Sequence, residues 1–91
     1  MKSNDTESLK AFGLFMNEVS NPGALDAKTK ELITISLVII EKCLPCLDSH
    51  YDKAKGMGIT IEEIDEAAWC AIAIGGACVR MFYAQWRKTH N

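Results

Sequence analysis

Apolar residues at helical spacing are the feature that most constrains how this chain can fold. The first apolar stripe recurs at spacings of three and four and consists of Leu9, Phe12, Phe15, Met16 and Val19. Such spacing is the period of one face of an α-helix. Similar stripes return in later segments, separated by turn sequences at residues 21–23 and 56–58. With no strand or repeat signal between them, we expect an all-α fold.

Capping residues predict where the helices begin. Thr6 or Asp5 can cap the first helix, and Asp26 can cap a second that runs from Ala27 to about Lys42. That second segment is apolar almost all round, and its near-continuous apolar surface over residues 32–40 is more than one small domain easily buries. Pro45 suits the first position of a third helix because it needs no hydrogen-bond partner there.

The second half of the chain predicts two further helical segments. The third helix should end near Lys55, with Gly56 and Gly58 forming its left-handed cap and turn. Thr60 to Glu63 fits a capping box at the start of a long apolar-faced helix. Gly75-Gly76 then marks a kink, a break between helices or a close backbone approach. The large apolar side chains of this half are interpreted as core or subunit interface: Trp69, Met81, Phe82 and Trp86.

Composition bounds the domain organisation and the partners. At 91 residues the chain predicts one domain over residues 1–91, yet 48% of its residues are hydrophobic. A lone domain of this size has difficulty burying so much apolar surface, so we expect a homo-oligomer. The formal charge is −2 and no run of basic residues stands out, which argues against nucleic acid as a partner.

The N-terminal sequence and the longest apolar stretch predict a cytoplasmic protein. The first ten residues are polar and acidic, where a secretory signal needs a basic start and an apolar stretch. The longest apolar stretch, residues 67–79, is shorter than the ~20 residues that cross a bilayer. The cytoplasm keeps structural thiols reduced, so a close pair of cysteines there indicates redox chemistry or a metal site.

Cys43 and Cys46 form a C-x-x-C pair, and His50 follows four residues after the second cysteine. A zinc site would need a fourth ligand, and no spacing in the sequence indicates one. Redox exchange fits better, because a helix N-terminus favours the thiolate and His50 lies one helical turn from Cys46. The other two cysteines, Cys70 and Cys78, are too far apart on a helix to pair and are interpreted as buried apolar side chains.

Glu31 extends this group to the pattern E-x11-C-x2-C-x3-H. With the surrounding residues 25–85, the pattern resembles the signature of the AhpD-like alkylhydroperoxidases, members of the carboxymuconolactone decarboxylase superfamily. The resemblance implies an all-helical fold with the dithiol at the start of a helix. It also implies a trimer or a hexamer, and no cofactor besides a redox-active Cys43–Cys46 disulfide.

The resemblance further implies a role for each residue of the pattern. Cys46 attacks the peroxide and becomes a sulfenic acid, and Cys43 closes the disulfide. Glu31 and His50 form a proton relay to the thiol. The substrate is then a peroxide or a disulfide, and a dithiol serves as electron donor.

Two points remain open in the sequence. The carboxylate that serves His50 is predicted to be Glu31 from the resemblance alone, while Glu41, Asp48 and Asp52 lie nearer in sequence. Peroxidase members carry a histidine just before the second cysteine, where this chain has Pro45. That departure puts peroxide turnover in doubt more than dithiol exchange.

The sequence therefore predicts a thiol-disulfide oxidoreductase or alkylhydroperoxidase with Cys46, Cys43, His50 and Glu31 as its catalytic residues. One alternative is a non-catalytic helical oligomer whose dithiol senses the redox state or binds a metal. Another is a lyase of the carboxymuconolactone decarboxylase type, whose members generally lack the paired cysteines.

Overall fold

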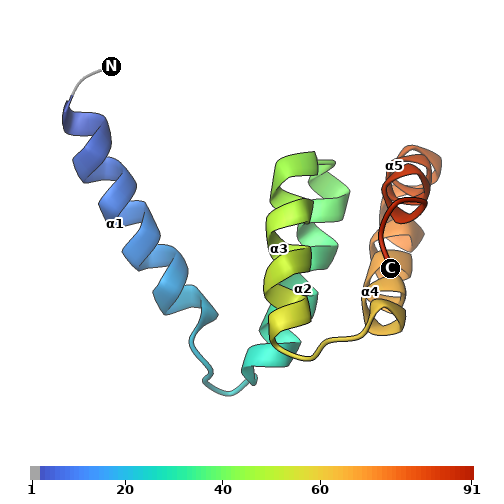
Figure 1. The fold of residues 1–91 in the computed structure, drawn as a ribbon, viewed down its shortest axis with the longest axis horizontal. Coiled ribbons are helices and arrows are strands. Elements are labelled where there is room, and N and C mark those ends of the chain that lie inside the picture. Colours follow the sequence, from blue (N-terminus) through green and yellow to red (C-terminus); the bar gives the residue numbers. More distant parts are fainter. Residues whose placement is uncertain (1–2) are drawn as a thin grey trace.

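The computed structural model describes the backbone of residues 3–91 and the side chains from residue 6 onward. Within this range the chain forms helices and no strand, which confirms the all-α prediction (Figure 1). The helices are α1 (Ser3–Ser20), α2 (Ala27–Glu41), α3 (Leu44–Gly56), α4 (Ile61–Gly75) and α5 (Ala77–Arg87). None of these helices is long and apolar enough to span a membrane.

Helix α2 is the centre of the fold and contacts every other helix. Its residues Ile35 and Ile39 are fully buried, together with Leu47 of α3 and Ile64 of α4. Helices α2 and α3 lie side by side, and α4 and α5 complete the body on the other side of α2 (Figure 1). Leu37 of α2 remains 57% exposed, so part of the apolar surface of this helix is not covered within the chain.

The cap residues of α2 and α4 act as predicted. The Asp26 carboxylate accepts a hydrogen bond from the Thr29 N–H at 2.8 Å. The Thr60 hydroxyl accepts from the Glu63 N–H at 3.1 Å, and the Glu63 carboxylate accepts from the Thr60 N–H at 2.9 Å. These bonds satisfy N–H groups that the first turn of a helix leaves without intrahelical partners.

Other predicted helix boundaries shift by one to three residues. Helix α1 begins at Ser3, before both predicted caps, so those residues lie inside the helix. Cys43 is the N-cap of α3, which moves Pro45 to the second helical position, where its missing N–H is equally harmless. Gly56 belongs to α3, and Gly58 alone takes the left-handed conformation, with φ +81°.

The glycine pair separates α4 from α5. Gly76 adopts φ 82° and ψ −157°, a conformation essentially limited to glycine. A Cβ on Gly75 would overlap the side chain of Val79, which is buried. Of the predicted alternatives, the structure therefore combines a helix break at Gly76 with a close approach at Gly75.

Several side chains predicted to be buried are exposed. Cys70 and Cys78 are both on the surface, so their interpretation as buried apolar residues is wrong. Trp69 is 59% and Met81 is 63% exposed, so neither belongs to the core of the single chain. The buried face of α4 consists of Ile64, Ala68, Ala71 and Ile72. Residues 69 and 70 lie off that face because each helical residue turns the side chain by about 100°.

Asp65 on α4 joins the two C-terminal helices through side-chain contacts with α5. It accepts hydrogen bonds from the Tyr83 hydroxyl at 2.5 Å and from Arg87 Nε at 2.8 Å. Burial alone would raise the pKa of the Asp65 carboxyl, but the hydrogen bonds from Arg87 and Tyr83 outweigh it and hold the pKa below its usual value. Burial and the bond to Asp65 raise the pKa of Tyr83.

We expect Asp65→Asn to lower the free energy of unfolding by about 1–2 kcal/mol at neutral pH, because a charged acceptor of the hydrogen bonds from Tyr83 and Arg87 is lost at a partly exposed site. The folded protein holds the Asp65 proton less tightly than the unfolded chain does. The contribution of the ionised Asp65 carboxylate to the free energy of unfolding should therefore be complete above about pH 4 and disappear as the pH falls further. Urea unfolding of both proteins at neutral and acidic pH measures it. Asp52→Asn, at an exposed site on α3, is the control, and equal losses in both variants would contradict the prediction.

Helix α1 leaves the body of the protein as an arm (Figure 1). It packs against α2, and its last residue, Ser20, lies 3.4 Å from Lys53 Nζ of α3. Lys30 of α2 holds this end of the helix, because its Nζ donates to the carbonyls of Val19 at 2.9 Å and Asn21 at 2.6 Å. The large apolar side chains of α1 remain exposed, with Leu9 at 70% and Phe15 at 60%. The predicted apolar stripe of this helix thus exists, and most of it is not covered by its own chain.

Candidate redox site

The turn between α2 and α3 places the first cysteine at the end of one helix and the start of the next. Lys42 takes the left-handed conformation, with φ 54°, and its N–H donates to the Ile39 carbonyl at 3.0 Å. The Cys43 N–H donates to the Val38 carbonyl at 3.3 Å, which completes a Schellman motif. The Cys43 carbonyl then accepts the first helical hydrogen bond of α3, from the Leu47 N–H at 3.0 Å.

Cys43 and Cys46 are joined in a disulfide at the N-terminus of α3, with their Cα atoms 5.3 Å apart. Both residues therefore lie where free backbone N–H groups and the helix dipole stabilise a thiolate. Cys46 is exposed and Cys43 is only partly exposed. Cys46 is thus the more exposed residue of the pair.

His50 lies one turn after Cys46 on α3 and contacts Glu31 on α2. The distance from His50 Nδ1 to Glu31 Oε2 is 2.7 Å. An ionised carboxylate only accepts hydrogen bonds, so Nδ1 carries the proton in this contact. His50 Nε2 then keeps its lone pair when the ring is neutral, and within residues 6–91 it has no hydrogen-bond partner. The imidazole is oriented by one nitrogen and free to accept a proton on the other.

Glu31 is the buried charged residue of the described chain, with 3% of its surface exposed. Its second oxygen, Oε1, lies 3.3 Å from Nζ of Lys53, one turn beyond His50 on α3. A buried carboxylate is tolerated when its oxygens have charged or hydrogen-bonding partners, and here each oxygen has one. Lys53 is not among the residues predicted for the site, although its spacing of three from His50 on a helix could have indicated it.

The nearer carboxylates that the sequence left open do not contact His50. Asp48 accepts a hydrogen bond from Trp86 Nε1 at 2.8 Å and lies 3.2 Å from Nε2 of His90. It therefore ties the end of α5 and the C-terminal segment to α3. Glu41 and Asp52 are exposed. Of the four candidate carboxylates, Glu31 is the one that the fold brings to His50.

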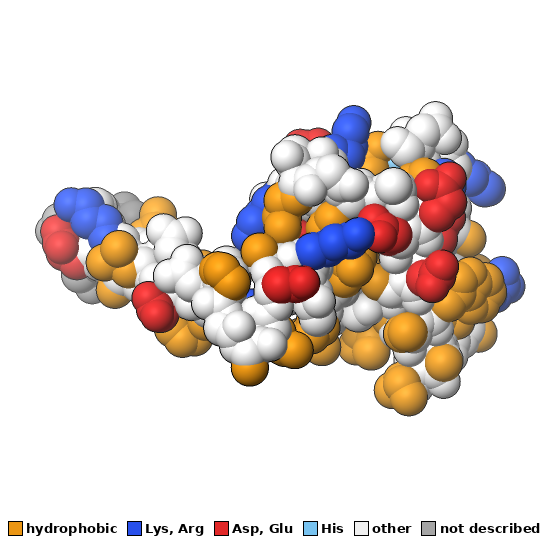
Figure 2. Space-filling view, turned by 90° about the horizontal axis from the view of Figure 1, so that it is seen from below, with side chains coloured by type: hydrophobic (Ala, Val, Ile, Leu, Met, Phe, Trp, Pro, Cys, Tyr) orange, Lys and Arg blue, Asp and Glu red, His pale blue; other side chains and the backbone are white. Residues whose placement is uncertain are grey.

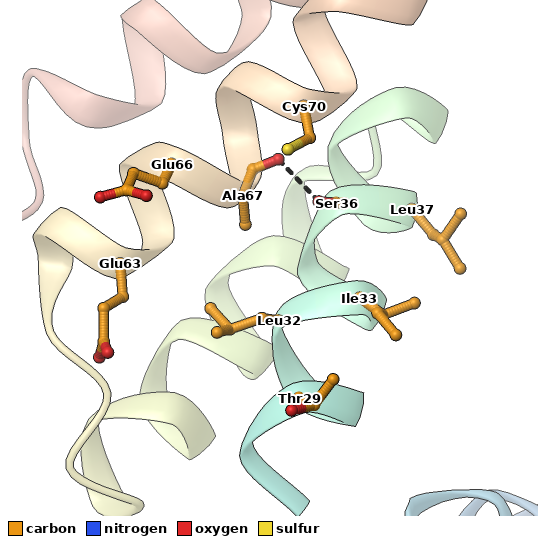
Figure 3. Close-up of a pocket in the computed structure, with 9 residues that line it drawn as sticks. All are labelled: Thr29, Leu32, Ile33, Ser36, Leu37, Glu63, Glu66, Ala67 and Cys70. Atoms are coloured by element: carbon orange, nitrogen blue, oxygen red, sulfur yellow. Dashed lines mark hydrogen bonds between the residues drawn. The ribbon is translucent and has the colours of Figure 1, made fainter. Parts of the chain in front are cut away.

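Besides a cavity of about 270 Å³ that Glu31 and Lys53 help to line, two cavities of the body bear on the dithiol turn and on Cys70. One, of about 530 Å³, lies between Leu44 of the dithiol turn and the end of α5, and Phe82, Trp86 and Lys88 help to line it. The other, also about 530 Å³, is a groove between α2 and α4 with Leu32, Ile33 and Ala67 in its lining (Figure 3). In that groove the Ser36 hydroxyl donates to the Ala67 carbonyl at 2.7 Å, and Cys70 lies beside them (Figure 3). Only the first cavity includes a residue of the C-x-x-C turn.

Metal-ligating side chains are not grouped in the described part of the chain. Within it, no three His, Cys, Asp or Glu side chains are arranged to hold a metal ion. The His50–Glu31 contact is therefore best described as a hydrogen-bonded pair beside a disulfide.

The helical fold and the C-x-x-C pair fit the superfamily that the sequence pattern resembles, and the comparison with family models agrees. The model of this family matches residues 6–87, and the chain belongs to it. The predicted superfamily is thereby confirmed.

Two relatives of the chain are informative. One is "uncharacterized protein 4 in cox locus" of Paracoccus denitrificans, 38% identical over 61 residues. These residues are 67% of this chain and 55% of the relative, so the chain spans little more than half the length of that protein. The other is a Thermotoga maritima protein with two similar crystal structures. One has a TM-score of 0.78 at 32% identity, covering 86% of this chain and 68% of that one.

The second Thermotoga structure has a TM-score of 0.72 at 31% identity and covers 89% of this chain and 91% of the other. It is described as a carboxymuconolactone decarboxylase family protein with a suggested involvement in the antioxidative response. The likeness supports the fold and the family of this chain.

Proposed function

We propose that the protein is a thiol-disulfide oxidoreductase of the AhpD-like kind, which reduces a peroxide or a disulfide through Cys46 and Cys43. One observation carries the proposal: an exposed Cys46, joined to Cys43 at a helix N-terminus, lies one turn from a histidine oriented by a buried carboxylate. A nucleophile, a base and a group that orients the base are the parts that nucleophilic thiol chemistry requires.

The first chemical step begins from the reduced dithiol. His50 Nε2 accepts the Cys46 proton, and the thiolate attacks one oxygen of a hydroperoxide. The S–O bond forms as the O–O bond breaks, and the leaving alkoxide takes the proton from His50. The products are an alcohol and a Cys46 sulfenic acid. With a disulfide substrate the thiolate instead attacks one sulfur, forming a mixed disulfide and releasing one thiol.

The second step closes the protein disulfide. The Cys43 thiol attacks the Cys46 sulfur and displaces water from the sulfenic acid, or the second thiol from the mixed disulfide. The oxidised state is the one that the structure contains. An external dithiol then returns two electrons, and no cofactor beyond the disulfide takes part. This cycle needs a reducing compartment, and the cytoplasm supplies one.

The relatives and the dithiol sequence bear on the choice of substrate. The Thermotoga relative is described with a suggested antioxidative involvement, which fits peroxide reduction. Pro45 carries no acid-base group at the second position of α3, so His50 must serve both the attack and the leaving group. This favours disulfide exchange as the faster activity, because a thiolate leaving group needs less protonation than an alkoxide.

Turnover with an organic hydroperoxide and with a model disulfide, run side by side with a dithiol reductant, tests the proposal. We expect both to be consumed, the disulfide faster, with no activity in Cys46→Ser. Ala77→Ser, at an exposed position that begins α5, is a control that should behave like wild type. Stoichiometric zinc without turnover would instead identify a metal clip, and release of CO₂ from a lactone acid would identify a decarboxylase.

We also propose that the protein works as a homo-oligomer, a trimer or a hexamer. The exposed apolar stripe of α1 supports this, and Figure 2 shows hydrophobic side chains exposed along the α1 arm and on the body. Lys30 holds the end of α1 in a direction that keeps its stripe off its own body. A second chain is therefore the simplest cover for this surface.

We expect light scattering in dilute neutral solution to give three or six times the chain mass of 10.1 kDa. Phe12→Asp combined with Phe15→Asp should lower the mass, because charges are introduced into the exposed apolar stripe. Asn17→Asp adds a charge at an exposed position of the same helix and serves as the control. A stable folded wild type of 10.1 kDa would show that the proposal is wrong.

A further inference from the structure

We propose that Lys53 is a positioning residue of the redox site, which holds the Glu31 carboxylate against His50 Nδ1 and thereby keeps His50 in the tautomer that can accept the Cys46 proton. This inference rests on the proposed function. It adds a third side chain to Glu31 and His50, the two residues that lead to the dithiol. Lys53 lies outside the E-x11-C-x2-C-x3-H pattern.

The contacts of Glu31 carry the inference. Its two carboxylate oxygens have one partner each, His50 Nδ1 at 2.7 Å and Lys53 Nζ at 3.3 Å. Glu31 itself is 3% exposed, so in the folded chain these two side chains, and not bulk water, are the partners of its carboxylate. Both partners come from the same face of α3, three residues apart, which lets one helix hold the whole carboxylate.

Lys53 is the cation in contact with Glu31 that stays charged throughout the proton transfer. Within the described residues, the other charged groups nearby have different partners. The Lys30 ammonium on α2 is bound to the carbonyls at the end of α1, and Lys28 pairs with Glu63 of α4 at 2.5 Å. Helix α1 contributes only the neutral Ser20 hydroxyl, 3.4 Å from Lys53 Nζ. His50 must be neutral in order to accept a proton, so it cannot supply the compensating charge during that step.

The consequence concerns the tautomer of His50. The carboxylate keeps the His50 hydrogen on Nδ1 only while one of its oxygens faces that nitrogen, and the contact of Oε1 with Lys53 fixes this orientation. When the carboxylate turns away, Nδ1 loses its acceptor, and the same hydrogen is free to move to Nε2. In that tautomer Nε2 has no lone pair for the thiol proton, so the base is disabled. Lys53 prevents this change by holding the carboxylate in place.

The test uses Cys46 as its own probe. Cys43, Cys70 and Cys78 are replaced by Ser so that Cys46 is the only thiol, and the rate of alkylation by iodoacetamide is measured from pH 5 to pH 10. We expect Lys53→Met to slow alkylation at neutral pH about tenfold and to move the profile about one unit to higher pH. Lys53→Arg should restore most of the rate, since it returns a cation to the same helix position.

Two further variants separate this role from a general effect of charge or of folding. Lys55→Met removes the same charge from the same helix, where the ammonium contacts only the Tyr51 ring, 4.9 Å from its centroid. It should alkylate within twofold of wild type. Glu31→Gln combined with Lys53→Met should equal Glu31→Gln alone, because Lys53 acts through Glu31.

Imidazole ¹⁵N spectra give a second, direct measurement. His50 should carry its proton on Nδ1 in the wild type and on Nε2 in Lys53→Met, with His90→Gln used to assign the two rings. Unchanged alkylation and tautomer in Lys53→Met, or equal losses in Lys53→Met and Lys55→Met, would overturn the inference. Neither readout requires turnover, so a chain that reduces no substrate but shows both effects would refute the proposed function and leave the role of Lys53 standing.

Discussion

Cys46→Ser is expected to remove the first oxidation step completely, whereas Cys43→Ser should leave a Cys46 sulfenic acid that the protein cannot resolve. The physical reason is the different position of the two sulfurs: Cys46 is exposed and one turn from His50, and Cys43 is partly buried at the helix cap. Mass spectrometry after a brief peroxide pulse, in the presence of a sulfenic-acid trap, measures both outcomes.

Cys70 and Cys78 complicate that experiment because both are exposed and can be oxidised. A background in which both are Ser removes this source of signal and should otherwise react like wild type. Trapping at Cys43 in the Cys46→Ser variant, with none at Cys46 in Cys43→Ser, would reverse the assignment. The dithiol would then have the polarity of thioredoxin-like motifs, in which the first cysteine is the nucleophile.

The second large effect is expected at the proton relay. His50→Ala removes the base and Glu31→Gln removes the carboxylate that orients it, so each should slow Cys46 alkylation at neutral pH by ~10²-fold or more. The double variant should be little slower than the slower single variant, since the two residues act in one chain. The pH dependence of alkylation in all four proteins provides the comparison.

Asp48→Asn and Asp52→Asn are the matched controls for the relay. Asp48 is bound to Trp86 and His90, and Asp52 is exposed, so neither change should alter the rate by more than a few fold. If Glu31→Gln alkylates like wild type while Asp48→Asn is slowed, the carboxylate that serves His50 in solution is not the one that contacts it here.

Much of the fold and part of the site could be predicted from the sequence because the signals are local. The Asp26 cap and the Thr60–Glu63 capping box depend on hydrogen bonds between residues three apart, which neighbouring residues make in any helix of that sequence. The placement of the dithiol at a helix N-terminus likewise follows from Pro45 and the end of the apolar segment before it. The one-turn spacing of Cys46 and His50 is a property of the helix alone.

Burial could not be predicted as well, because it depends on which faces meet. Cys70 and Trp69 lie in an apolar segment, yet α4 turns Ala68 and Ala71 toward the core and leaves them outside. The apolar stripe of α1 has the spacing of a core helix. In the structure, however, Lys30 binds the C-terminal end of α1, and the rest of the helix extends away from the other four helices (Figure 1). Periodicity identifies an apolar face and does not identify its partner.

Interactions within one turn of helix thus specify the helices, their caps and the spacing of Cys46 and His50, so these features can be predicted from the amino-acid sequence. Helix packing is what brings Glu31, nineteen residues before His50, into contact with it and places Lys53 at the other oxygen. Those contacts depend on how α2 and α3 pack after the Lys42 turn. The angle and register of two packed helices are set by the buried side chains between them, and no spacing along the chain specifies them.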